Sequence, residues 1–198
     1  MGIACGLAWT SVGGDTVQIE VNVMPGKGNL QLTGQMGDVM KESAQTALSY
    51  VRSVVSREYG VEEAYFETHD LHIHIPEGAV PKDGPSAGIT MATAMLSAVT
   101  GRAVAARVAM TGEITLRGHV LMIGGLKEKL LAARMARIRK VLVPEKNRPD
   151  VEELPREITK GMEIVYVKEM DEVLREALVP GEEAEKRPGR KRKAAESS

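Results

Sequence analysis

A serine stands at the start of an apolar stretch, directly after a run rich in glycine and proline. Ser86 follows residues 81–85 (PKDGP), and the small apolar residues from 86 to 100 predict a helix that Gly101 ends. At a helix N-terminus, backbone N–H groups without helical partners meet the positive end of the helix dipole. Acyl transfer needs such donors to hold the oxyanion of its tetrahedral intermediate. Ser86 is therefore a candidate nucleophile, and the alternative is a serine that simply begins a helix.

A lysine lies on the apolar face of the predicted helix over residues 126–139. At about 100° per residue, Lys129 shares a stripe with Leu126, Ala132, Ala133 and Ala136, on which it is the only charge. Burial disfavours an ammonium ion and lowers its pKa, and a neutral amine is a general base able to take a proton from a serine hydroxyl. The alternative is a lysine whose stem covers the alanines while its amine reaches water.

The elements that must position these two residues alternate without a strict βαβ order. Alternation over residues 16–24 predicts a strand, and residues 30–33 are predicted to return beside it as a hairpin through the turn at 25–29. A long helix is predicted over 36–59, ended by Gly60. Further strands are predicted over 71–75, 107–111, 113–120, 141–144 and 163–167, and a last helix over 169–177. The predicted fold class is α+β, with mixed sheets packed against helices.

Length and composition indicate one ordinary globular domain. The 198 residues are 43% hydrophobic and 27% charged, and we place the domain at residues 1–180. Residues 181–198 consist mainly of Glu, Lys, Arg, Gly, Ala and Ser, which predicts a disordered, charged tail. The net charge of −1 and the aromatic content of 3% argue against a nucleic-acid partner that relies on charge or base stacking.

Other sequence features bound the location and the cofactors. The single Cys5 fits a reducing compartment, and no signal peptide or membrane span is recognisable, so we expect a cytoplasmic protein without membrane contact. No phosphate-binding glycine loop is present, so this chain alone is not expected to hydrolyse ATP. Trp9 is expected to anchor the packing near the chain start.

Two further clusters were weighed as binding sites. His72 and His74 share one face of a predicted strand, a spacing compatible with a metal, but no third ligand is evident, so we expect no metal site. The basic residues between 186 and 193 could touch nucleic acid, although the acidic residues between 182 and 185 partly balance them and favour a solvated tail.

Three blocks of sequence carry a family resemblance. They are PKDGPSAG at 81–88, AMTGEITLRG at 109–118 and IGGLKEKL at 123–130. Their order and spacing resemble those of the proteolytic domain of bacterial Lon proteases, and the likeness runs from about residue 6 to about residue 178. The resemblance implies a compact α+β domain that assembles as a hexameric ring around an enclosed chamber.

The resemblance also implies a serine–lysine dyad, a variant of the catalytic triad in which lysine replaces histidine. Ser86 matches the nucleophile and Lys129, the second lysine of its block, matches the general base. Thr111 matches a hydroxyl that orients the lysine amine. The other matching positions are Asp83 and Glu113, acidic residues beside the site, and Ser86 and Ala87, whose backbone N–H groups would form the oxyanion hole.

The implied function is that of a serine endopeptidase in protein quality control, which cleaves unfolded or damaged polypeptides through an acyl-enzyme. We expect the ATPase and substrate-recognition regions of such a protease to be missing from this chain. Accordingly no cofactor is expected here, with ATP and magnesium confined to the missing ATPase domain. Two rivals stay open: a catalytically silent or nucleic-acid-binding module of the same fold, and a hydrolase with the same dyad acting on a non-peptide ester.

Overall fold

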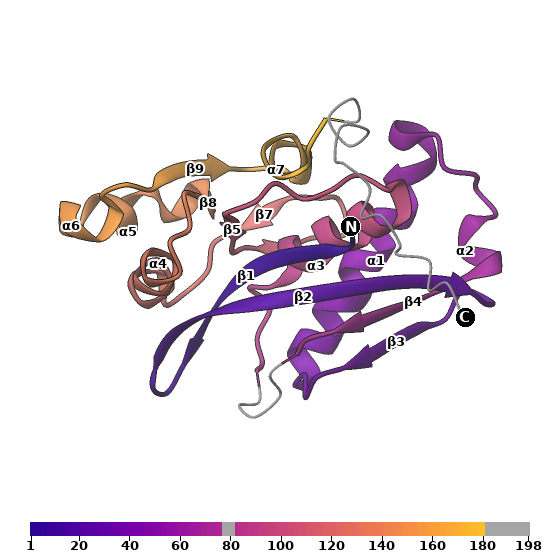
Figure 1. Ribbon diagram of the computed structural model, residues 1–198, viewed down its shortest axis with the longest axis horizontal. Helices are drawn as coiled ribbons and strands as arrows, with labels where there is room; N and C mark the ends of the chain where they lie inside the picture. Colours follow the sequence, from indigo (N-terminus) through magenta and orange to yellow (C-terminus); the bar gives the residue numbers. More distant parts are fainter. Residues whose placement is uncertain (77–81, 181–198) are drawn as a thin grey trace, which may run out of the picture.

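The computed structural model describes residues 1–76 and 82–180 of the chain. Across these residues, seven strands form one mixed sheet in the order β3-β4-β2-β1-β5-β8-β9 (Figure 1). Its strands are β1 (Ile3–Thr10), β2 (Gly13–Pro25), β3 (Leu30–Thr33), β4 (His69–His74), β5 (Val108–Met110), β8 (Lys140–Pro144) and β9 (Glu163–Val167). A separate antiparallel pair is formed by β6 (Glu113–Ile114) and β7 (Val120–Leu121). The predicted mixture of sheet and helices is confirmed.

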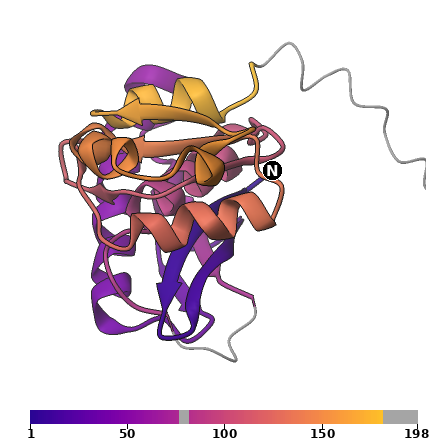
Figure 2. The ribbon, with the colours of Figure 1, turned by 90° about the vertical axis from the view of Figure 1, so that its left-hand side faces the viewer.

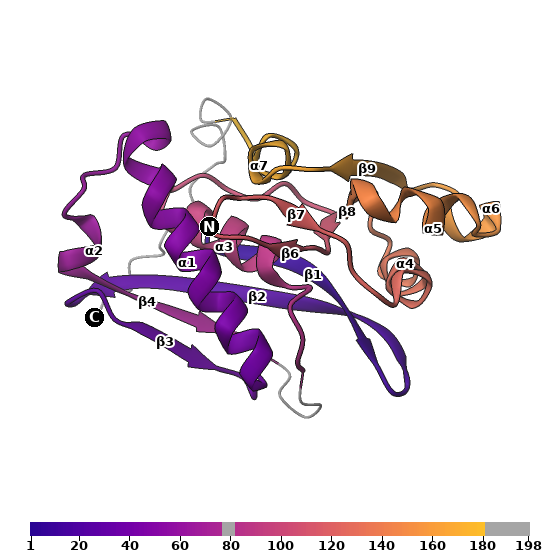
Figure 3. The same ribbon diagram turned by 180° about the vertical axis from the view of Figure 1, so that it is seen from behind.

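Helices cover both faces of this sheet. They are α1 (Asp38–Tyr59), α2 (Tyr65–Thr68), α3 (Gly88–Thr100), α4 (Leu126–Met135), α5 (Arg148–Glu152), α6 (Arg156–Thr159) and α7 (Met170–Ala177), with a short 3₁₀ turn, η1, at Glu145–Asn147. Figure 3 shows α1 crossing in front of the sheet beside α3, on the face that is turned away in Figure 1, whereas Figure 2 shows α4 lying in front of β1 and β2. None of the helices in the described part of the chain is long and apolar enough to cross a membrane.

Side-chain alternation along the central strands creates the two packing faces. In β5, Met110 belongs to the larger core beneath α1 and α3, and its neighbour Ala109 belongs to a second core under α4. In β8, Leu142 faces the first core, whereas Val141 and Val143 face the second. Successive side chains point to opposite faces of a strand, so strands buried on both sides read as continuous apolar runs. Helices α3 and α4 therefore lie on opposite sides of the same strands.

The predicted pairing of residues 16–24 with residues 30–33 is wrong. Strand β2 pairs with β1 and with β4 in antiparallel fashion, and β3 instead runs parallel to β4 at the edge of the sheet. The turn between β2 and β3 passes around the start of β4, where the Asp70 carboxylate accepts hydrogen bonds from the N–H groups of Lys27 at 2.8 Å and Asn29 at 2.7 Å. The turn predicted at 25–29 is present, but β4, which comes about forty residues later in the chain, lies between the two strands that the turn connects.

Three element boundaries also differ from the prediction. The strand predicted over 113–120 is two short strands, β6 and β7, because a turn ending at Gly118 (φ 84°) intervenes. Helix α3 begins at Gly88, two residues after Ser86. Helix α4 ends at Met135 rather than 139, and Arg137 adopts a left-handed conformation with φ 57°.

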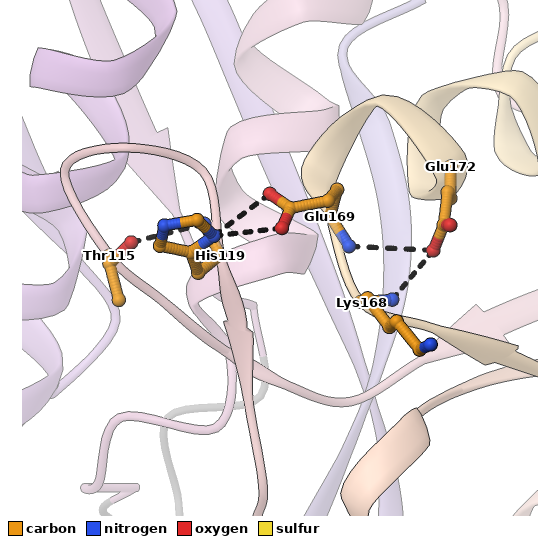
Figure 4. Close-up of polar contacts among 5 residues, drawn as sticks. All are labelled: Thr115, His119, Lys168, Glu169 and Glu172. Carbon is orange, nitrogen blue, oxygen red and sulfur yellow. Dashed lines mark hydrogen bonds and ion pairs between the residues drawn. The ribbon is translucent and has the colours of Figure 1, made fainter.

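The turn between β6 and β7 is attached to the start of α7 (Figure 4). The imidazole of His119 lies 2.8 Å from a carboxylate oxygen of Glu169, and its backbone N–H donates to the hydroxyl of Thr115 at 3.0 Å. Glu169 in turn is the N-cap of α7 and forms a reciprocal capping box with Glu172. The small sheet that follows residue 112 is thereby held at its far end.

Candidate active site

Ser86 lies half-buried just before the first turn of α3. Its carbonyl oxygen accepts a hydrogen bond of 2.8 Å from the N–H of Gly112, and the carbonyl of Gly112 accepts one of 3.2 Å from the N–H of Ile89. The N–H of Gly88 donates to the Pro85 carbonyl at 3.1 Å, which closes a tight turn around the serine. Gly112 thus fastens the serine loop to the end of β5.

Gly88 must lack a side chain for this packing. A Cβ atom at this position would lie 2.8 Å from the Cγ2 atom of Ile114 and 3.0 Å from the hydroxyl of Ser43. The small residues around the serine therefore let α3 approach β6 and α1 closely.

Lys129 is buried within α4, with 3% of its surface exposed. Its amine donates a hydrogen bond of 3.2 Å to the hydroxyl of Thr111, which is itself fully buried. Desolvation by burial lowers the pKa of Lys129 to about 8. The buried stripe predicted from the helical wheel is found for Leu126, Ala132 and Ala133. Ala136 is exposed, because the helix has ended before it.

One cavity of about 200 Å³ brings the serine and the lysine together. Its polar lining includes Ser86, Lys129 and Asp83. The other lining residues are small or apolar: Gly6, Leu7, Ala8, Trp9, Val17, Met40, Ala87, Gly124 and Gly125. A cavity with apolar walls and few polar groups suits a substrate side chain next to a reacting bond.

Asp83 holds the serine loop against another helix. Its carboxylate accepts hydrogen bonds from the backbone N–H groups of Met40 at 2.9 Å and Gly84 at 2.8 Å, and these bonds lower the pKa of the Asp83 carboxyl. Met40 belongs to the first turn of α1, whose N-cap residue Gly37 provides no side-chain hydrogen bond. Asp83 therefore caps α1 from outside the helix, and a Cβ atom on Gly37 would overlap its carboxylate.

Thr111 does not line this cavity itself but bonds to Lys129, which does, whereas Glu113 is not among the described residues that line it. Glu113 lies half-buried in β6, where it pairs with Leu121. Glu113 is therefore close to Thr111 in the sequence but does not share the cavity that Ser86 and Lys129 line.

Sequence reasoning missed or misjudged several residues at the site. Trp9 is 62% exposed and lines the cavity, so its predicted role as a packing anchor is wrong. Met40 lies in the helix predicted over 36–59, and nothing in the sequence indicates its contact with Asp83 or its place in the cavity lining. Asn147 was not singled out at all, although it is fully buried and grips the segment before α4. Its only sequence signal is an asparagine in a charged stretch, which is typical of surface turns.

The two histidines that were weighed as metal ligands contact a threonine instead. The hydroxyl of Thr33 lies 2.8 Å from Nε2 of His72 and 2.7 Å from Nδ1 of His74. Over residues 1–76 and 82–180, no group of three or more His, Cys, Asp or Glu side chains is arranged to hold a metal ion. The basic tail lies outside the described residues.

Comparison with known proteins gives one consistent family. A family model for the Lon protease (S16) C-terminal proteolytic domain matches residues 1–180. The chain is 73% identical over 179 residues to the Lon protease of Lachnoclostridium phytofermentans, an overlap of 90% of this chain and 22% of that protein. It is 58% identical over 179 residues to the Lon protease of Clostridioides difficile and to Lon protease 1 of Bacillus subtilis, covering 90% of this chain and 23% of each relative. The chain thus spans less than a quarter of the length of these curated relatives.

Proposed function

Because this chain belongs to the Lon protease (S16) C-terminal proteolytic domain family, we propose that it is a serine endopeptidase with Ser86 as nucleophile and Lys129 as general base. The observation that carries the proposal is the buried amine of Lys129, which bonds to Thr111 and lines the same cavity as Ser86. A serine without a nearby base, or a lysine whose amine is exposed to water, would not support this chemistry.

The lowered pKa of Lys129 is what makes the amine useful as a base. With a pKa of about 8, roughly a tenth of the lysine is neutral at about pH 7, whereas an ordinary lysine is almost entirely protonated there. The bond to Thr111 fixes the direction of the amine, so that its lone pair can face the cavity.

The proposed reaction proceeds in two halves. The neutral amine of Lys129 takes the hydroxyl proton of Ser86 as the serine oxygen attacks the carbonyl carbon of the peptide bond. The carbon–nitrogen bond then breaks, the lysine ammonium gives its proton to the departing amine, and an acyl-enzyme ester is left on Ser86. In the second half a water molecule loses a proton to Lys129 and its oxygen attacks the ester carbonyl carbon. The bond from that carbon to the Ser86 oxygen then breaks, the lysine ammonium returns its proton to the serine oxygen, and the carboxylic acid is released.

The oxyanion of each tetrahedral intermediate needs donors that are already in place. The N–H groups of Gly88 and Ile89 donate to the Pro85 and Gly112 carbonyls. We therefore assign the oxyanion contacts to the N–H groups of Ser86 and Ala87, at the positive end of α3.

The substrate and the partners follow from the family. We propose that the substrates are unfolded or damaged polypeptides, delivered by ATPase and substrate-recognition regions of the kind that the longer relatives have room for. ATP and magnesium would act in those regions and take no part in bond cleavage by this chain. The proposal further includes a homohexameric assembly and a cytoplasmic location.

The test compares peptide cleavage by matched variants. A fluorogenic peptide should be cleaved by the protein, and Ser86→Ala and Lys129→Ala should each reduce the rate by at least about a thousandfold. Lys127→Ala is the control, because Lys127 lies on the same helix with its side chain exposed to solvent, and it should cleave normally.

Wild-type rates in either dyad variant would overturn the proposal. An ester analogue of the same peptide distinguishes the proposed peptidase from the rival that hydrolyses only non-peptide esters. Such an esterase would cleave the ester and leave the peptide intact. A protein that forms no acyl-enzyme with either substrate would instead be the catalytically silent relative.

A further inference from the structure

Asn147 is a fully buried polar side chain whose hydrogen-bonding groups are all engaged. Its carbonyl oxygen accepts a bond of 3.0 Å from the N–H of Ile123, and its amide donates one of 2.8 Å to the carbonyl of the same residue. The second amide hydrogen goes to the Asp150 carboxylate at 2.7 Å. A buried amide is retained only where such bonds offset its desolvation, so this arrangement specifies one position of Ile123.

The residue that Asn147 holds begins the segment leading to Lys129. Gly124 and Gly125 follow Ile123 directly, and both line the cavity that contains Ser86. Gly125 is the N-cap of α4, in the left-handed region with φ 66°, and its carbonyl accepts the backbone N–H of Lys129 at 3.1 Å. The N-cap of helix α4 therefore lies two residues after Ile123, the residue that Asn147 holds. The position of Lys129 along the helix axis depends on where the helix begins.

Apolar packing alone would hold this segment less definitely. Leu126 and Leu130 pack in the core beneath α4, but such contacts are not directional and tolerate sliding and rotation of a helix. A pair of hydrogen bonds to both backbone groups of one residue fixes distance and direction together. Asn147 comes from η1, directly after β8, so it ties the start of α4 to the central sheet.

We propose that Asn147 is a positioning residue for peptide cleavage: by bonding both backbone groups of Ile123 it sets where α4 begins and keeps the Lys129 amine against Thr111, in the cavity that Ser86 also lines. This inference rests on the proposed function, in which Lys129 is the base. Asn147 touches neither substrate nor reacting atoms and acts through the backbone of the segment between residues 123 and 129.

The informative substitution is Asn147→Asp, which keeps the size of the side chain. The aspartate cannot donate to the Ile123 carbonyl, and it places a second carboxylate beside Asp150. A displaced base should lower kcat by about tenfold to a hundredfold and leave KM within about twofold, because substrate binding does not use Asn147. The acid limb of the kcat profile should move to higher pH by about one unit, since a better hydrated lysine has a higher pKa.

Two control variants separate positioning from general stability. Asp150→Asn retains an oxygen that accepts the Asn147 amide hydrogen and should keep both the rate and the pH profile. Val54→Ala removes buried side-chain volume from α1, in the other core, and should lower the melting temperature without moving the acid limb. If Asn147→Asp changes the rate and the limb no more than Val54→Ala does at an equal loss of stability, the inference is overturned.

A measurement without substrate distinguishes failure of this inference from failure of the proposed function. The titration of Lys129 can be followed by NMR of isotope-labelled lysine, with the resonance assigned by its loss in Lys129→Ala. A moved titration in Asn147→Asp supports the positioning role, and an unmoved one refutes it. If the titration moves while Lys129→Ala still cleaves peptides, the positioning stands and the assignment of Lys129 as the base is what fails.

Discussion

The amine of Lys129 donates a 3.2 Å hydrogen bond to the hydroxyl of Thr111, and both side chains are shut away from solvent. Thr111 follows β5 directly, and the N–H of the next residue, Gly112, donates a hydrogen bond to the carbonyl of Ser86. Two consecutive residues thus contact the lysine on one side and the serine loop on the other.

Replacing Thr111 by valine should impair cleavage while preserving the shape of the core. Valine fills the same volume but offers no oxygen to the lysine amine, so the amine loses its orientation and the hydrogen bond that it makes to a side chain among the described residues. We expect kcat to fall by about tenfold or more, with KM little changed. Thr111→Ser is the matched control, since it restores the hydroxyl, and activity in the serine variant as low as in the valine variant would contradict this account.

Replacing Lys129 by methionine should change how stability depends on pH. The folded-state pKa of about 8 lies below the ordinary lysine pKa of 10.5, so below about pH 8 the folded protein carries the cost of a buried ammonium. That cost disappears as pH rises from 8 towards 10.5, because the unfolded chain then binds more protons than the folded one. Relative to Lys129→Met, the wild type should therefore gain up to about 3 kcal/mol in unfolding free energy across this window.

The measurement is urea unfolding of both proteins at several values of pH. Lys127→Met serves as the matched control for the loss of a lysine from α4, because the Lys127 side chain is exposed to solvent. A constant difference for Lys129→Met would mean that the amine is protonated in the folded protein throughout.

Replacing Asp83 by alanine should weaken both the fold and the cleavage. The carboxylate caps α1 and holds the serine loop, so its removal leaves the N–H of Met40 without this partner and loosens Ser86. We expect a lower melting temperature together with a lower kcat. Asp38→Ala is the comparison, because Asp38 lies in the first turn of the same helix and is exposed, and an equal loss of kcat there would refute the link to the serine loop.

Because its folded pKa is lowered, Asp83 also makes a contribution that depends on pH. The stabilisation is present above the pKa of the unfolded carboxyl and is lost as pH falls through the lower folded pKa. Melting curves of Asp83→Ala should therefore differ from the wild type most at neutral pH and converge in acid.

Replacing His119 by alanine should have little effect on stability. The side chains of His119 and Glu169 are 54% and 44% exposed, and exposed ion pairs contribute at most about 1 kcal/mol. The backbone bonds of the neighbouring residues, from Val120 to Lys168 and from Met170 to Gly118, both 2.8 Å long, remain in the variant. Thermal melting checks this, and a loss well above that size would give the pair a larger role than its exposure suggests.

Much of this fold is readable in the sequence because its long elements have clear periodicity. Helix α1 and strand β9 lie close to their predicted limits, and Gly60 and Gly101 end their helices in the left-handed conformation. The order of strands in the sheet could not be read, because insertion of β4 beside β2 depends on pairing between distant residues. Periodicity indicates which face of a strand is buried but not which strand lies next to it.

The same division applies to the site. The helix face of Lys129 left open whether its amine is buried or reaches water, and the structure shows it buried. The expectation that it pairs with Ser86 comes from the family resemblance. The contact of Asp83 with α1 and the grip of Asn147 on Ile123 join segments that are far apart in the chain. In each contact a polar side chain bonds to backbone atoms. Every residue has the same backbone atoms, so the sequence does not indicate which of them will be the partner.

The placement of α3 and α4 on opposite faces of the central strands has a consequence during synthesis of the chain. If Ser86 and Lys129 act as proposed, a chain of which only about the first 120 residues have emerged holds the serine without its base. The two side chains would then come together only once β5 and β8 are paired and α4 has packed on its own face of the sheet. On the proposed function, a nascent or partly unfolded chain should therefore not cleave other proteins, because cleavage would require the completed sheet.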